Sequence, residues 1–342
     1  MDIKWTTYRI KTVHPFGISR STHTFYDVVF VYIIDGDIVG RGEAAPPIRY
    51  GETKNAVLTQ LETKIELLAD YDSVAHLIDH LVLHSGGLKS LEAAISMAAL
   101  DWWTQKNNIP LYSYFDADPS KMPQTSFTIA IGELETIPQK ISEAEPYPIL
   151  KVKLGTSQDK EIIQAIRRVT DKTVRVDANE GWNLETAIEM SFWLADRNVE
   201  FIEQPLKADS IEETAILKRK SPIPIIADEN SMVSTDIPKI AHAFHGINIK
   251  LMKCGTLSEA QKMIRIAREY EMSVMLGCMV ESSVGITAAA HLSPLVDYAD
   301  LDGNLLIGND PYLGVLVSDG QLKLNDSPGL GVTPIADPEG LL

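Results

Sequence analysis

The sequence predicts an α/β protein in which a (β/α)8-type barrel follows an N-terminal α+β domain. After residue 122, short apolar runs alternate with helical patterns, and the starts of successive runs are 23 to 26 residues apart. This spacing is the length of one strand, one helix and two loops. Before residue 122, the pattern is instead typical of an antiparallel sheet followed by helices.

The N-terminal domain is expected to span residues 1–122. Residues 7–39 have the pattern of strands, and Asp35-Gly36-Asp37 between two apolar runs indicates a hairpin. Helical periodicity covers residues 56–83. Ser90 is the predicted N-cap of a mostly buried helix over residues 90–105.

The barrel domain is expected over residues 123–311. Its eight apolar runs occupy residues 126–131, 149–154, 174–177, 200–203, 224–228, 247–250, 273–276 and 297–302. Eight such units close a barrel, and a doubly wound open sheet is the alternative. The regular spacing and the lack of a glycine-rich dinucleotide turn after the first run favour the barrel. Residues 312–342, rich in Gly and Pro, are expected to pack on the N-terminal sheet.

Composition excludes several classes of partner. The chain has 342 residues, 45% of them hydrophobic, and a formal net charge of −16 at pH 7. This charge repels phosphate backbones and anionic lipids, so we expect neither nucleic acid nor a membrane as partner. No window approaches the roughly 20 apolar residues of a membrane span, and we expect a cytoplasmic protein. Cys254 and Cys278 are too few for a disulfide framework.

Charged residues lie in or at the ends of the predicted strands, namely Lys151, Lys153, Asp177, Glu203, Asp228 and Lys250. The carboxyl ends of barrel strands converge on one cavity. A single Asp at such a place is usually a helix cap, and a single Lys usually marks an edge strand. Three consecutive strands that end in a carboxylate are harder to explain in this way. A hard divalent cation such as Mg²⁺ would relieve their repulsion.

The segments that contain these residues resemble the enolase superfamily, in its muconate-lactonizing-type branch. They are KVK (151–153), VDAN (176–179), FIEQP (201–205), ADEN (227–230) and INIKLMKCGT (247–256). The resemblance covers nearly the whole chain, including residues 93–112, which are similar to the family's connection between cap and barrel. It implies a capping domain completed by residues 312–342, and a barrel of either the full (β/α)8 form or a modified 7/8 form.

The resemblance also implies the roles of the site residues. Asp177, Glu203 and Asp228 would hold Mg²⁺, and Lys153 and Lys250 would be the two catalytic acid/base groups. Lys253 is the local alternative to Lys250, but Lys250 ends the apolar run, whereas Lys253 is expected in the following loop. The family abstracts the proton α to a carboxylate and stabilises the resulting enediolate with the metal. Lysines on both faces allow racemisation or epimerisation.

Asp300 and Asp302 share one face at the end of the last strand, which suits a cation, a solvated loop or a helix cap. This DxD pattern resembles the motif with which dipeptide epimerases hold the free α-ammonium group. Residues 276–292 and 301–306 resemble the same group. The resemblance therefore implies an isomerase, a Mg²⁺-dependent epimerase of dipeptides such as L-Ala-D/L-Glu or hydrophobic dipeptides. Peptidoglycan-peptide recycling or peptide catabolism would be its setting, and a homo-oligomer is expected.

Further substrate contacts are expected from Lys151, Thr128, Cys278 and Arg20. Arg20, in the cap loop 16–24, resembles a loop arginine that pairs with a glutamate side chain, and a plain surface charge is the alternative. Thr128 and Cys278 are equally well explained as small packing residues. Within the superfamily, the alternatives are a cycloisomerase, an o-succinylbenzoate synthase or an N-acylamino acid racemase. A Schiff-base aldolase or a non-catalytic binding protein would not need three converging carboxylates.

Overall fold

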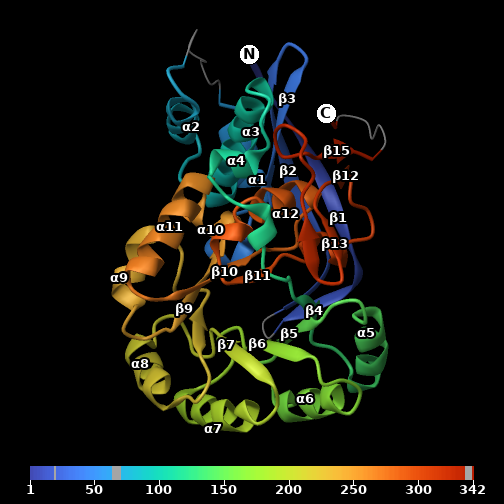
Figure 1. Cartoon of the computed structure of the whole chain (residues 1–342), viewed down its shortest axis with the longest axis vertical. Helices are drawn as coiled ribbons and strands as arrows, with labels where there is room; N and C mark the ends of the chain where they lie inside the picture. The colour runs from blue at the N-terminus through green and yellow to red at the C-terminus, as the bar shows by residue number, and fades with distance from the viewer. Residues whose placement is uncertain (19–20, 64–70, 336–340) are drawn as a thin grey trace.

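The computed structural model describes residues 1–18, 21–63, 71–335 and 341–342, and the chain forms a barrel beneath a cap (Figure 1). The barrel strands and most of their helices form the lower part of this view. The cap sheet, the first helices and both chain ends lie above them. The predicted fold class, an α/β barrel with an N-terminal α+β capping domain, is confirmed.

The cap begins with an antiparallel sheet of β1 (Asp2–Ile18), β2 (Ser21–Asp35) and β3 (Ile38–Ala44), in that order. The predicted hairpin at residues 35–37 is confirmed, because Asp35 pairs with Ile38 and Gly36 has a φ of 60°. The register between β1 and β2 shifts between Lys11 and Phe16. The first strand begins at Asp2, which is earlier than the sequence pattern indicates.

Helices lie on one side of the sheet. Against its strands pack α1 (Lys54–Leu61) and α3 (Lys89–Lys106), and against α3 pack α2 (Val74–Val82) and the short α4 (Leu111–Tyr114). The prediction that Ser90 caps α3 is wrong, because Leu88 is the N-cap and Ser90 lies inside the helix. Instead, Glu52 accepts hydrogen bonds from Lys89 N at 2.6 Å and from Ser90 N at 3.0 Å. A carboxylate from a preceding loop thus satisfies the first turn, and no local cap is needed.

The barrel consists of eight parallel strands in sequence order. They are β4 (Phe127–Ile129), β5 (Ile149–Lys153), β6 (Thr173–Asp177), β7 (Val199–Glu203), β8 (Ile225–Ala227), β9 (Gly246–Lys250), β10 (Ser273–Gly277) and β11 (Tyr298–Asp300). Each overlaps one of the predicted runs. The first and last strands meet at a parallel bridge between Thr125 and Ala299, so the barrel is nearly closed.

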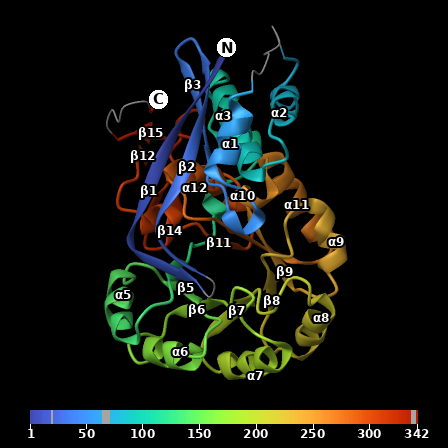
Figure 2. The ribbon, with the colours of Figure 1, turned by 180° about the vertical axis from the view of Figure 1, so that it is seen from behind.

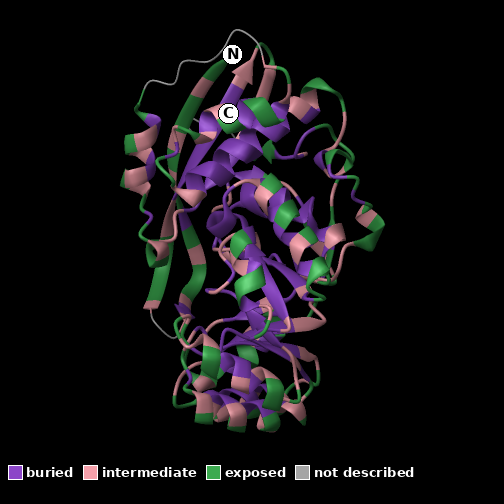
Figure 3. Cartoon of the chain, turned by 90° about the vertical axis from the view of Figure 1, so that its left-hand side faces the viewer, coloured by how far each residue is buried: buried purple, intermediate pink, exposed green. Residues whose placement is uncertain are grey.

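The barrel helices are α5 (Ile137–Glu143), α6 (Asp159–Arg167), α7 (Leu184–Ala195), α8 (Ile211–Lys220), α9 (Ile237–Ile240), α10 (Leu251–Cys254), α11 (Leu257–Glu269) and α12 (Ser283–Ala290). Every residue of α12 is buried. Figure 3 shows that buried residues continue from the barrel into the cap. The two parts therefore share an extensive apolar contact. None of the described helices combines the length and the apolar character needed to cross a bilayer.

The C-terminal segment returns to the cap, as the predicted fold class requires. It forms β12 (Tyr312–Leu313) with β15 (Thr333–Pro334), and β13 (Leu316–Ser318) with β14 (Gln321–Lys323). The Tyr312 ring lies 5.2 Å from that of Phe30, and its hydroxyl lies 2.9 Å from the hydroxyl of Tyr32. Seen from behind, this segment lies beside β1 and β2 (Figure 2).

Candidate active site

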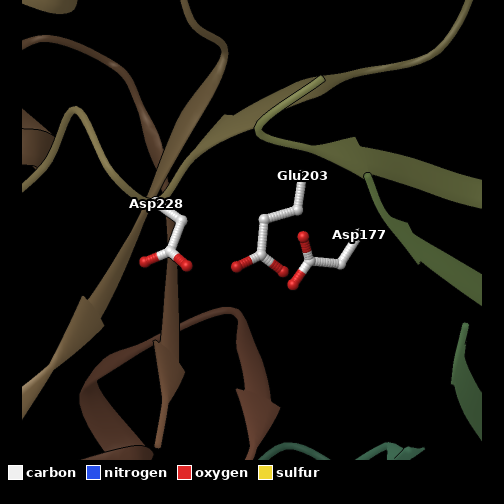
Figure 4. A group of neighbouring side chains, drawn as sticks. All are labelled: Asp177, Glu203 and Asp228. Atoms are coloured by element: carbon white, nitrogen blue, oxygen red, sulfur yellow. The ribbon is translucent and has the colours of Figure 1, made fainter. Parts of the chain in front are cut away.

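Three carboxylates meet at the carboxyl ends of neighbouring strands. Asp177 ends β6, Glu203 ends β7, and Asp228 directly follows β8. One oxygen from each lies within 4.8 Å of the others, and all three side chains are buried. Figure 4 shows them side by side, facing one space. Within the described parts of the chain, no other group of three potential ligands is as close.

Strand register explains why two of these carboxylates meet. Lys153 is the register partner of Asp177, and Asp177 is the partner of Glu203. Parallel strands in register place the side chains of partner residues at one height on the same face. Lys153, Asp177 and Glu203 therefore present their charges in one layer at the mouth of the barrel, whereas Asp228 lies two residues after Ile226, the register partner of Glu203, and joins them from the end of β8.

A lysine stands at each end of this row of carboxylates. Lys153 Nζ lies 2.6 Å from Asp177 Oδ2, and Lys250 Nζ lies 2.8 Å from Asp228 Oδ2. Both lysines are buried. Burial alone would lower the pKa of Lys250, but the negative charges of Asp228 and Glu203 outweigh it and raise the pKa. The arrangement offers one proton carrier on each side of the space.

The carboxylates differ in how well they are neutralised. Burial raises the pKa of Glu203, and the adjacent Asp177 raises it further. For Asp177, burial acts in the same direction, but Lys153 and Lys151 outweigh it and lower the pKa to about 2. Mg²⁺ prefers carboxylate oxygens in a site that leaves positions for water or substrate. This buried set of oxygen donors therefore fits the ion.

The DxD motif lies beside the carboxylates. Lys151 Nζ is 2.6 Å from Asp300 Oδ2 and 2.7 Å from Glu203 Oε2, so this lysine links the motif to the row. Asp302 Oδ2 accepts a hydrogen bond of 2.6 Å from Thr128 N. Burial and the neighbouring Asp300 raise the pKa of Asp302 to about 7. Asp300 thus already has a cationic partner, Lys151, whereas Asp302 forms no ion pair within the part of the chain that the structure describes.

The other predicted contact residues divide into two groups. Thr128 meets Asp302 through its backbone N–H, and Cys278 Sγ lies 3.3 Å from the backbone oxygen of Asp300. Both therefore lie beside the DxD motif. Arg20 falls outside the described residues. The structure brings together Lys151, Lys153, Lys250, Asp177, Glu203, Asp228, Asp300 and Asp302.

Comparison with known families agrees with this geometry. Residues 137–337 match the family model described as enolase C-terminal domain-like. The chain belongs to the enolase superfamily. A relative in this superfamily, the L-Ala-D/L-Glu epimerase of Bacteroides thetaiotaomicron, is 38% identical over 98% of this chain and 88% of its own length. The hydrophobic dipeptide epimerase of a Flavobacteria bacterium is 35% identical, over 96% of this chain and 97% of its own.

Solved structures of the superfamily have the same fold. The substrate-liganded L-Ala-D/L-Glu epimerase of Bacillus subtilis has a TM-score of 0.92 at 26% identity, covering 98% of this chain and 99% of that one. The dipeptide epimerase of Cytophaga hutchinsonii, in complex with Mg and D-Ala-L-Val, has a TM-score of 0.90 at 29% identity, covering 98% and 96%.

Lys253 has a closer link to the site than sequence reasoning assigned to it. It lies in α10 rather than in a loop, and its side chain is fully buried. Its Nζ donates to Asp228 Oδ1 at 2.5 Å, to Asp228 O at 2.6 Å and to Asn248 O at 3.0 Å. All three ammonium hydrogens thus have acceptors. Lys253 lies about one helical turn after Lys250, so both lysines reach Asp228. This spacing of three residues was the sequence feature that could have indicated a shared partner.

Two side-chain amides contact the metal-ligand candidates, one at a carboxylate and one at a backbone N–H. Asn248 Nδ2 donates to Glu203 Oε1 at 2.7 Å, and Gln204 Oε1 accepts from Asp228 N at 2.9 Å. These contacts fix the orientation of the metal-ligand candidates. Gln204 follows Glu203 directly and has a φ of 35°, a left-handed conformation that no sequence pattern indicated.

Proposed function

We propose that this protein is a Mg²⁺-dependent dipeptide epimerase acting at the carbon α to the C-terminal carboxylate. The observation that supports this best is the placement of Lys153 and Lys250 at opposite ends of the carboxylate row. A single base suffices for elimination, whereas inversion of a carbon centre is served by one proton carrier on each face. The names of the relatives agree with this conclusion.

The three carboxylates and the two lysines have different parts in the proposed reaction. The chemistry that Mg²⁺ supplies when bound to Asp177, Glu203 and Asp228 is neutralisation of the negative charge that develops on the substrate carboxylate. Lys153 takes the α-proton from one face of the substrate, and Lys250 returns a proton to the other face. Both lysines are buried, which keeps their ammonium groups away from bulk water.

The free ammonium group of the substrate is assigned to Asp300 and Asp302. Asp302 is buried and its pKa is raised to about 7, so an approaching cation would favour its ionised form. Thr128 and Cys278 line the same place, and Arg20 is proposed to meet the side chain of the C-terminal residue. An N-acylated substrate has no such cation and gains nothing from these carboxylates.

The proposal extends to domains, setting and assembly. Residues 1–122 form the capping domain, residues 123–311 the catalytic barrel and residues 312–342 the segment that completes the cap. We propose a cytoplasmic homo-oligomer that acts on peptides from peptidoglycan recycling or peptide catabolism. Light scattering on the purified protein measures its assembly, and a monomer would contradict that part.

The function is tested with a dipeptide library in deuterated water. With Mg²⁺, dipeptides that are substrates gain one mass unit as their α-proton is replaced, and chelation of the metal abolishes the gain. N-acylamino acids form the control set. Mass gain by N-acylamino acids alone would assign the protein to the racemases, and full activity in excess chelator would refute the metal dependence.

A further inference from the structure

An ion pair joins the cap to the barrel beside the candidate active site. Arg49 lies in the 3-10 turn η1 (Ile48–Tyr50), which follows β3 of the cap. Its Nη2 lies 2.5 Å from Oε2 of Glu180, which belongs to the loop after β6. The side chain of Glu180 is only 8% exposed, whereas that of Arg49 is 45% exposed. The carboxylate is therefore largely removed from water, which strengthens its attraction to the guanidinium.

Glu180 is also tied to the loops that follow the metal-ligand candidates. Its Oε1 accepts a hydrogen bond of 2.9 Å from Ala208 N. The carbonyl of Ala208 accepts from Asn230 Nδ2 at 2.8 Å, and Asn230 Oδ1 accepts from Gln204 Nε2 at 2.7 Å. Gln204 in turn accepts the hydrogen bond from Asp228 N. A continuous chain of contacts therefore runs from the carboxylate row to Glu180.

The backbone at this place is held in an unfavourable conformation. Asn179 and Glu180 have φ values of 45° and 64°, in the left-handed region, as does Gln204. Such a conformation is unfavourable for residues other than glycine, least so for asparagine, and it persists where the surroundings determine it. These conformations fall in the loops that begin directly after Asp177 and Glu203. The contacts of Glu180 are part of what holds them.

The ion pair borders a cleft among the loops that follow β5, β6 and β7. The cleft has a volume of about 580 Å³ and is lined by Arg49, Gly155, Asn179, Glu180, Gly181, Lys207, Ala208 and Asp209. The position of η1 therefore determines how Arg49 closes the cap side of this cleft.

We propose that the Arg49–Glu180 ion pair is a latch that seats residues 46–53 of the cap on the barrel mouth and so retains the bound substrate. Arg49 and Glu180 are positioning residues, since they act through the cap loop that contains Arg49. This inference rests on the proposed epimerase function for its kinetic test. A loop that leaves its seat more often releases substrate faster, while the chemical step in the closed complex is unchanged.

The test is a double-mutant cycle of Arg49→Gln and Glu180→Gln, which keeps the side-chain lengths. The glutamine at position 180 retains an oxygen for Ala208 N. Each single variant should raise KM about three- to tenfold with kcat within about twofold, because a partly exposed ion pair contributes modestly. The double variant should be no worse than the worse single variant, and Arg49→Lys should recover part of the loss.

The matched control is Arg9→Gln. Arg9 forms an ion pair of 2.8 Å with Asp27 within the cap sheet and is 52% exposed, so its loss removes a similar interaction away from the site. KM should remain at the wild-type value. Strictly additive penalties in the cycle, or a fall in kcat with KM unchanged, would overturn the latch.

Hydrogen exchange of the amides in residues 46–53 separates this inference from the proposed function, because it needs no substrate. Exchange should be faster in both single variants than in the wild type and the Arg9→Gln control. If no dipeptide is epimerised but exchange responds in this way, the function fails and the latch stands. Unchanged exchange in both variants would remove the latch even if dipeptides are substrates.

Discussion

Replacement of Lys253 by methionine tests whether the contacts of this buried lysine with Asp228 and Asn248 stabilise the folded protein. Methionine keeps most of the apolar stem but removes the three hydrogen bonds to Asp228 and Asn248. Removal of one partner from a buried ion pair typically costs about 3–5 kcal/mol. Lys250 still pairs with Asp228 at 2.8 Å, so part of the charge stays compensated. We therefore expect the variant to lose about 2–4 kcal/mol in the free energy of unfolding.

The assay is urea unfolding at pH 7.5 in the presence of chelator, followed by circular dichroism. Lys239→Met is the matched control, because Lys239 is 69% exposed and its ion pair with Asp236 spans 3.2 Å. That variant should change the free energy of unfolding by at most about 0.5 kcal/mol. A loss for Lys253→Met no larger than that of the control would refute the reasoning, since Lys253 would then contribute no more than a surface charge.

Three further predictions concern the chemistry and the pH dependence. Lys153→Ala and Lys250→Ala should each abolish epimerisation because each face needs its own proton carrier, and NMR should detect solvent exchange of the α-proton in at most one epimer; wild-type turnover by either variant would contradict this. Asp302→Asn should lower kcat/KM on a free dipeptide about 10- to 100-fold but cost little further on an N-acetylated one, and additive penalties would show that the carboxylate does not meet the ammonium. Burial raises the pKa of Glu43 from 4.5 to about 7, so the folded chain holds a proton that the unfolded chain has lost, and this group lowers stability as pH rises across that window. Glu43→Gln should remove that part of the slope between pH 5 and 7.5 in urea unfolding, and an unchanged slope would be the contrary result.

The barrel could be predicted because its repeat is local. Each strand and helix occupies a nearly constant length of chain, so apolar runs recur at regular intervals, and a charge at the end of a run is visible in the printed sequence. Asp177, Glu203 and Lys250 were found in this way.

Contacts between distant segments could not be predicted. Glu52 accepts a hydrogen bond from the first turn of α3 although it lies 37 residues earlier in the chain. The sequence pattern does not show this contact, so Ser90 was wrongly predicted to be the N-cap. Lys253 was placed in a loop because the short helix α10 has no periodicity of its own. The link from Glu180 to Arg49 spans 131 residues. Such pairs depend on the packing of whole elements, which a single sequence does not display.

The seating of Glu43 on α12 limits how this protein can be recombined with its relatives. Glu43 belongs to β3 of the cap, yet it accepts hydrogen bonds from Ser282 N, Ser282 Oγ and Gly285 N at the start of a barrel helix. A side chain at Gly285 would meet Glu281 Oε2 at 2.3 Å. A hybrid of this barrel with the cap of a relative would leave those hydrogen-bond donors buried without an acceptor, unless the new cap has an acidic residue at the position of Glu43. A hybrid that exchanges only loops, and takes β3 and the first turn of α12 from the same parent, keeps these hydrogen bonds.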